Sequence, residues 1–145
     1  MAGDTVFRLP LTGEVNLTVY FEDMEIGDKL VIGSYTFRAE EIKAFAGKFD
    51  PQSFHLDEEA AKQGLFGRLC ASGRHTASVW MKLMVTYYYA DPRNAWPRFG
   101  PSPGFRDMKW IKPVYVDDTI TYTSRVISKR NLASKPGWGL MESLN

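Results

Sequence analysis

Apolar and polar side chains alternate along several stretches of the chain, a pattern that predicts β-strands with one buried face. Residues 29–37 and 119–129 show the alternation most clearly. Residues 105–111 and 139–144 are interpreted as two further strands, the last of them preceded by a Pro-Gly turn. The second half of the chain is therefore predicted to be a run of antiparallel strands.

Two short helices are predicted between the first strand and the middle of the chain. Helix-forming residues with apolar positions on one face extend over residues 38–46 and again over residues 57–63. Residues 47–53 separate them as a break. Asp57 is placed to cap the second helix and Gly64 to end it.

The longest helical pattern covers residues 74–90 and is apolar nearly all round. A helix of that kind is expected to be buried within a larger structure. An Asp-Pro pair stops it, and residues 91–105, rich in proline and glycine, are expected to form a long loop. The outline is an α+β fold in which an antiparallel sheet packs on a long central helix.

Composition and charge exclude several classes of function. The 145 residues contain 18 lysines and arginines against 17 aspartates and glutamates, a net charge of +1. No basic excess favours nucleic-acid binding. The most apolar segment, residues 77–85, is interrupted by Lys82 and is shorter than the roughly 20 residues that span a bilayer. No membrane or nucleic-acid partner is expected, and no phosphate-cradling glycine loop indicates an organic cofactor.

The cysteine and histidine content limits metal and redox chemistry. Cys70 is the only cysteine, so the chain has no internal disulfide, which is typical of a reducing compartment. His55 and His75 are the only histidines and show no compact ligand spacing, so no metal site is predicted. The first ten residues carry no long apolar stretch. A cytoplasmic location is expected.

Asp50 and His55 form the first candidate site. They lie five residues apart across an Asp-Pro turn, where a bent segment can bring a carboxylate and an imidazole to one point. Such a pair suits proton transfer during the addition of water to a conjugated thioester. The residues alone are also consistent with a purely structural role, in which Asp50 forms an Asx turn and His55 is a packed side chain.

Ser72 and Gly73 open the long helix and form the second candidate site. The first N–H groups of a helix have no partners within it, and the helix dipole places partial positive charge there. An enolate oxygen could therefore be stabilised at this end, as in an oxyanion hole. The alternative is that the two residues only cap the helix.

Together these features resemble the MaoC-like dehydratases and (R)-specific enoyl-CoA hydratases. That family has an Asp, four intervening residues and His-x-Asp, then Phe-Gly, then a small-residue stretch that enters a long helix. This chain has Asp50, His55 and Asp57, followed by Phe66-Gly67 and by Ala71-Ser72-Gly73. Later motifs are also similar to the family's: Ser102-Pro103-Gly104-Phe105, Trp110, Pro113-Val114 and Asp118-Thr119.

The resemblance implies a hot-dog fold, an antiparallel sheet wrapped around a long central helix, that is usually dimeric. It implies that Asp50 and His55 hold the catalytic water and that the Gly73 N–H contacts the thioester carbonyl. It also gives supporting positions to Ser72, His75 and Ser78. The implied substrates are an acyl-CoA thioester and water, and the implied reaction is hydration of a 2-enoyl thioester or its reversal.

This chain departs from the family pattern at three places. Pro51 directly follows Asp50, Ser72 replaces a histidine found in many members, and Arg74 stands where a subgroup has Trp. The family also supplies another strand beyond the position of Asn145. We therefore expect residues 1–18 to be a lead-in, and residues 19–145 to be one hot-dog domain that lacks a final strand or fills its place with the lead-in.

Three alternatives remain at the level of sequence. A hot-dog thioesterase is disfavoured because its acidic residue commonly lies on or near the central helix, and residues 74–90 contain no Asp or Glu. A non-catalytic acyl-thioester-binding or assembly subunit would keep the fold without needing the Asp–His pair. The aromatic residues could instead mark an interaction surface, although large aromatics more often pack inside a fold.

Overall fold

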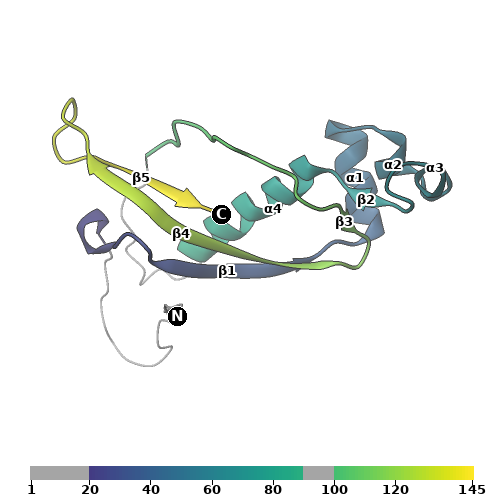
Figure 1. The fold of residues 1–145 in the computed structure, drawn as a ribbon, viewed down its shortest axis with the longest axis horizontal. Coiled ribbons are helices and arrows are strands. Elements are labelled where there is room, and N and C mark those ends of the chain that lie inside the picture. Colours follow the sequence, from purple (N-terminus) through teal and green to yellow (C-terminus); the bar gives the residue numbers. More distant parts are fainter. Residues whose placement is uncertain (1–19, 90–99) are drawn as a thin grey trace, which may run out of the picture. The chain divides into compact units, whose positions relative to one another are not determined.

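The computed structural model describes residues 20–89 and 100–145, and Figure 1 shows the arrangement of its elements. Helices and strands alternate in the first half, and strands make up the second half. In chain order the elements are η1 (Phe21–Asp23), β1 (Lys29–Thr36), α1 (Ala39–Phe49), α2 (Ser53–Leu56), α3 (Glu58–Gln63), β2 (Cys70–Ala71), α4 (Gly73–Tyr89), β3 (Val114–Tyr115), β4 (Thr119–Asn131) and β5 (Gly139–Leu144).

The larger sheet has three strands in the order β1-β4-β5. β1 and β4 are antiparallel, because Val126 in the second half of β4 bonds to Gly27 and Asp28 before β1, whereas Phe37 after β1 bonds to Asp118 just before β4. β4 and β5 form an antiparallel hairpin with an irregularity between Val126 and Ser128. These three strands confirm the predictions for residues 29–37, 119–129 and 139–144.

The predicted strand over residues 105–111 is wrong. Residues 107–112 make no backbone–backbone hydrogen bond to another described residue, and a strand exists only where a neighbour pairs with its backbone. Asp107 interrupts an extended path with a φ of 55°. The chain instead pairs slightly later, where the two-residue β3 bonds antiparallel to β2, a small sheet that the sequence pattern did not predict.

Of the short helices, α3 matches its prediction, whereas α1 is longer than predicted and α2 was not predicted. α3 is confirmed, and its cap is the predicted one, since the Asp57 carboxylate accepts the Ala60 N–H at 2.7 Å. α1 continues three residues beyond its predicted end and stops at Asp50, because the residue before a proline is disfavoured in helical conformation. The predicted break over residues 47–53 is therefore too long, and the single turn α2 was not predicted.

The long helix α4 is present, but the described part of the single chain buries less of it than its apolar character predicts. Its buried residues are His75 and Val79, four positions apart and so on one stripe. Met81, Val85 and Tyr89 are 43%, 49% and 74% exposed. The rest of the described chain covers one face of α4 and leaves these apolar side chains in solvent. None of the described helices has the length and apolar character needed to cross a membrane.

The chain divides into two compact units, and α4, β1 and β4 each contribute residues to both. The first comprises residues 1–33, 84–101 and 121–145, and its described part buries Met24, Ile32 and Val126. The second comprises residues 34–83 and 102–120 and holds most of the buried side chains, among them Phe37, Ile42, Ala46, Ala61, Leu69 and Cys70. The α+β layout is confirmed, and the boundaries predicted for the domain stay a prediction.

Removal of the Asp57 cap should destabilise the protein. Asp57→Ala leaves the Ala60 N–H without its acceptor and is expected to lower the free energy of unfolding by about 1 kcal/mol. Asp57→Asn keeps a side-chain oxygen and should lose less. Urea denaturation measures both.

The matched control is Glu59→Ala in the same turn, where the carboxylate pairs with Lys62 on the surface and contributes little. A loss for Asp57→Ala no larger than that for Glu59→Ala would contradict the capping role.

Candidate active site

Asp50 is held at the junction between α1 and α2 by hydrogen bonds of its backbone and its side chain. Its backbone N–H donates to the Ala46 carbonyl at 2.9 Å, which closes the last turn of α1. Its carboxylate accepts from the Gln52 side-chain amide at 2.8 Å and from the Ser72 hydroxyl at 2.6 Å. Both carboxylate oxygens therefore have a fixed donor.

These donors determine the charge of Asp50. The Ser72 hydroxyl contributes most and the Gln52 amide next, and together they lower the pKa of the carboxyl below its ordinary value. Partial burial of the group opposes this shift but does not reverse it. Asp50 is consequently an ionised carboxylate at neutral pH.

His55 lies on the single turn α2 and is 5% exposed. Its Nδ1 atom is 2.7 Å from the Cys70 carbonyl oxygen. Because a carbonyl oxygen can only accept, Nδ1 carries the hydrogen of this bond. The other ring nitrogen, Nε2, faces the Asp50 carboxylate with 3.5 Å between Nε2 and Oδ2. The predicted pair thus comes together.

Ser72 connects this pair to the start of α4. The residue is 1% exposed, and while its hydroxyl donates to Asp50 its oxygen accepts the Arg74 N–H at 3.1 Å. A hydroxyl has one hydrogen to donate, and here it goes to the carboxylate while a lone pair serves the helix. The carboxylate is therefore tied directly to the amino end of α4.

Gly73 is the first residue of α4 and is covered by Trp110. A Cβ atom at Gly73 would lie 2.5 Å from two carbons of the Trp110 indole, a distance that no real side chain tolerates. A larger residue at position 73 would therefore displace the indole from its present place. The sequence identified Gly73 as a candidate through its place at the helix start, but it gave no sign that Trp110 would be its neighbour.

His75 and Ser78, the other predicted supporting residues, lie further along α4. The His75 ring stacks on Phe45 with 4.6 Å between centroids and meets the edge of Phe37 at 5.1 Å. Burial lowers the pKa of His75, and its Nδ1 atom has no hydrogen-bond partner among the described residues. Ser78 is exposed and donates to the Arg74 carbonyl at 2.8 Å. Neither has a hydrogen bond to Asp50 or His55, and their supporting roles stay predictions.

Three contacts at the site were missed from the sequence. Gln52 could have been suspected, since it lies two residues from Asp50. The Cys70 carbonyl is a backbone group that no side-chain pattern reveals, and Trp110 is distant in the chain. Across residues 20–89 and 100–145, no three His, Cys, Asp or Glu side chains gather in a way that could hold a metal ion.

Comparison with known proteins identifies relatives over most of the chain. A family model described as MaoC like domain matches residues 22–137. The uncharacterized protein YdeM of Bacillus subtilis (strain 168) is 34% identical over 110 residues, which are 75% of this chain and 74% of YdeM. The family model covers the segment that contains Asp50, His55 and Gly73.

Solved structures are similar as well. The MaoC-like dehydratase from Rhodospirillum rubrum is 35% identical with a TM-score of 0.74, covering 86% of this chain and 82% of that one. The (R)-hydratase from A. caviae involved in PHA biosynthesis is 27% identical with a TM-score of 0.53, covering 75% of this chain and 76% of that one. These similarities confirm the predicted hot-dog fold, and the chain belongs to the MaoC-like dehydratase family.

Proposed function

We propose that this protein is a hydratase/dehydratase that adds water to a 2-enoyl thioester, such as an acyl-CoA, or removes it from the 3-hydroxyacyl product. The observation that carries the proposal is the pairing of an ionised Asp50 carboxylate with the oriented His55 ring, 3.5 Å apart. The names of the related dehydratase and (R)-hydratase support the same reaction class.

The water is proposed to bind between the two side chains. With Nδ1 donating to Cys70, Nε2 presents a lone pair toward the Asp50 carboxylate in the form of the ring that can act as a base, and the carboxylate also only accepts. One water molecule can donate a hydrogen to each, which turns the lone pairs of its oxygen toward a substrate. One of the two groups takes a proton from the water as its oxygen bonds to the β-carbon, and the protonated group then delivers that proton to the α-carbon, so that both groups return to their starting state.

The amino end of α4 is proposed to stabilise the charge that this addition creates. Attack at the β-carbon moves an electron pair to the thioester carbonyl, whose oxygen becomes an enolate. The Gly73 N–H belongs to the first turn of a helix, where N–H groups have no partner within the helix and the dipole is positive. Donors placed in this way stabilise a developing oxyanion.

Two other activities remain testable against this proposal. A thioesterase would release free thiol from an acyl-CoA, but α4 contains no Asp or Glu to support that chemistry. A non-catalytic acyl-thioester-binding subunit would bind acyl-CoA without turnover. Assays of free thiol and of the enoyl chromophore therefore separate all three.

Assembly and location belong to the same proposal. We expect a homodimer or a dimer-based oligomer, because apolar side chains of α4, such as Met81 and Val85, are largely exposed in the single chain. The cytoplasmic location expected from the sequence stays a prediction.

Loss of either member of the pair should abolish hydration. Asp50→Asn and His55→Gln remove the groups that exchange protons with water, and kcat for crotonyl-CoA is expected to fall by about 10²-fold or more. The decrease in ultraviolet absorbance of the conjugated enoyl thioester measures the rate.

Glu59→Gln is the matched control, since it neutralises an exposed carboxylate near the same segment, and it should retain the wild-type rate. Wild-type protein without activity on enoyl thioesters of several chain lengths would refute the hydratase assignment. Asp50→Asn with full activity would remove Asp50 from the mechanism.

The Ser72 hydroxyl should set the pKa of Asp50. Ser72→Ala removes the largest of the influences that lower this pKa, so the pKa should rise, and Gln52→Ala should raise it by a smaller amount. The carbon-13 shift of the Asp50 carboxyl, followed against pH in each variant, measures the change. An unchanged midpoint in Ser72→Ala would contradict this assignment.

The hydrogen bond from Ser72 to Asp50 also makes the stability of the protein depend on pH. Because the pKa of Asp50 is lower in the folded than in the unfolded protein, the ionised group stabilises the fold above its unfolded pKa, and this contribution is lost as the pH falls through the folded pKa. Ser72→Ala should therefore show a weaker loss of stability on acidification than wild type.

A further inference from the structure

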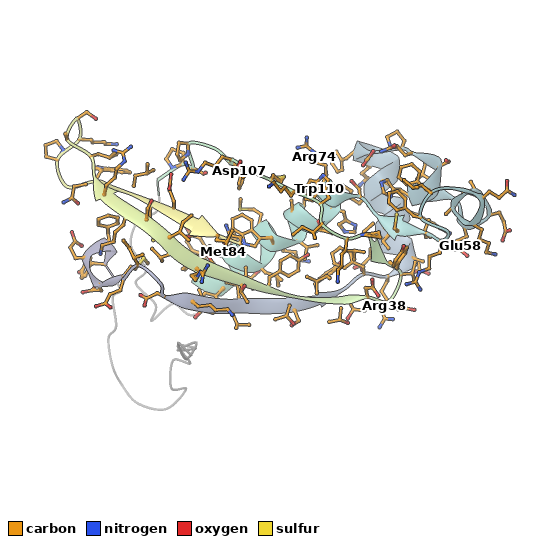
Figure 2. All side chains as sticks on the ribbon, in the orientation of Figure 1. Arg38, Glu58, Arg74, Met84, Asp107 and Trp110 are labelled. Atoms are coloured by element: carbon orange, nitrogen blue, oxygen red, sulfur yellow. The ribbon has the colours of Figure 1, made fainter. Side chains whose placement is uncertain are left out.

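The Trp110 indole lies flat against the backbone at the first residue of α4. The space that a Cβ of Gly73 would occupy is filled by the indole, with Cδ2 and Cε2 each 2.5 Å away and Cγ 2.9 Å away. Figure 2 shows Trp110 close to Arg74 at this end of the helix. Trp110 is nonetheless 53% exposed, so much of its surface is open to a ligand.

Side-chain contacts with α4 hold this part of the chain. Phe105 meets the edge of Trp80 at 6.2 Å between ring centroids, and Trp110 covers Gly73, two turns nearer the amino end. Between them, residues 107–110 make no backbone–backbone hydrogen bond to another described residue. The segment therefore runs along α4 and delivers an indole to its first turn without being part of a sheet.

Trp110 is separated from the catalytic carboxylate by two adjacent residues. The indole covers Gly73, and the hydroxyl of the preceding residue, Ser72, donates to Asp50 at 2.6 Å. A thioester whose carbonyl reaches the Gly73 N–H while its β-carbon lies near Asp50 and His55 must pass beside the indole.

We propose that Trp110 is a substrate-binding residue, whose indole forms one wall of the thioester site and packs against the bound thioester group. This inference rests on the proposed function. A 2-enoyl thioester is planar through its conjugated bonds and offers a flat apolar face to an aromatic ring. Its polarisable sulfur is a further favourable contact for that ring. Trp110 should therefore contribute to binding and orientation, while proton transfer stays with Asp50 and His55.

Tryptophan fluorescence tests the contact directly. Butyryl-CoA has no double bond to hydrate, so binding can be titrated without turnover. Wild-type protein should show a saturable change in emission, and Trp110→Phe should lose most of it. Trp138→Phe is the matched control, since Trp138 packs with Lys135 and Gly100 in the other unit, and it should keep the change. A response retained in Trp110→Phe would overturn the proposal.

Steady-state kinetics separate binding from a purely structural role. Trp110→Ala should raise KM for crotonyl-CoA by about tenfold, the size expected for one lost aromatic contact of about 1.4 kcal/mol, and Trp110→Phe should raise it less. Circular dichroism checks that both variants are folded. A KM within twofold of wild type in folded Trp110→Ala would overturn the proposal.

A double-mutant cycle tests whether the indole acts at Gly73. Gly73→Ala places a methyl group against the indole and should weaken butyryl-CoA binding in wild type. In the Trp110→Ala background that clash is gone, so the same substitution should cost less. Equal costs in the two backgrounds would show that the indole does not act at this position in the bound state.

The outcomes distinguish this inference from the proposed function. A wild-type protein that binds butyryl-CoA through Trp110 but hydrates no enoyl thioester would refute the hydratase and leave Trp110 as a binding residue. Hydration with unchanged KM in Trp110→Ala would refute the Trp110 role alone. Neither binding nor turnover by wild type would overturn both.

Discussion

The bond from the Ser72 hydroxyl to Asp50 is the interaction on which the site depends. A partly buried carboxylate loses hydration, and it stays ionised only where donors replace the lost water. Ser72 supplies the stronger donor, and the same oxygen accepts an N–H from the first turn of α4. One hydroxyl therefore keeps the carboxylate charged and fixes it beside the amino end of α4. Alanine at this position would lose both functions, although it would fit the space.

The short strands β2 and β3 orient His55, as Ser72 orients Asp50. β2 and β3 pair over two residues each, which contributes little to a sheet, but the pairing fixes the direction of the Cys70 carbonyl. That carbonyl holds the hydrogen of Nδ1 and so determines which nitrogen faces Asp50. The orientation of the imidazole thus depends on a backbone group, so a substitution of the Cys70 side chain can leave it intact as long as the pairing with β3 survives.

The sequence predicted the parts of the fold and site that depend on local chemistry. The alternation in β1, β4 and β5 and the cap at Asp57 depend on residues that are neighbours in the chain, and the Asp50–His55 pair on one bent segment. The predicted strand over residues 105–111 failed because pairing depends on a partner that the local pattern does not contain. The burial of α4 was overestimated for the same reason, since apolar character indicates what a helix can bury and not how much of it the chain covers. The packing of Trp110 on Gly73 joins segments far apart in sequence and has no local signal.

The contacts that hold Asp50, His55 and Ser72 differ in kind from those that hold Trp110. Asp50, His55 and Ser72 are each held by hydrogen bonds within 2.6 to 2.8 Å to fixed partners, so their geometry is set before any ligand arrives. Trp110 is held by its packing on Gly73, in a segment whose residues 107–112 make no backbone–backbone hydrogen bond to another described residue. Displacing it costs contact area and no hydrogen bond. A substitution of Trp110 can therefore change this side of α4 without disturbing the charge of Asp50 or the position of the hydrogen on His55.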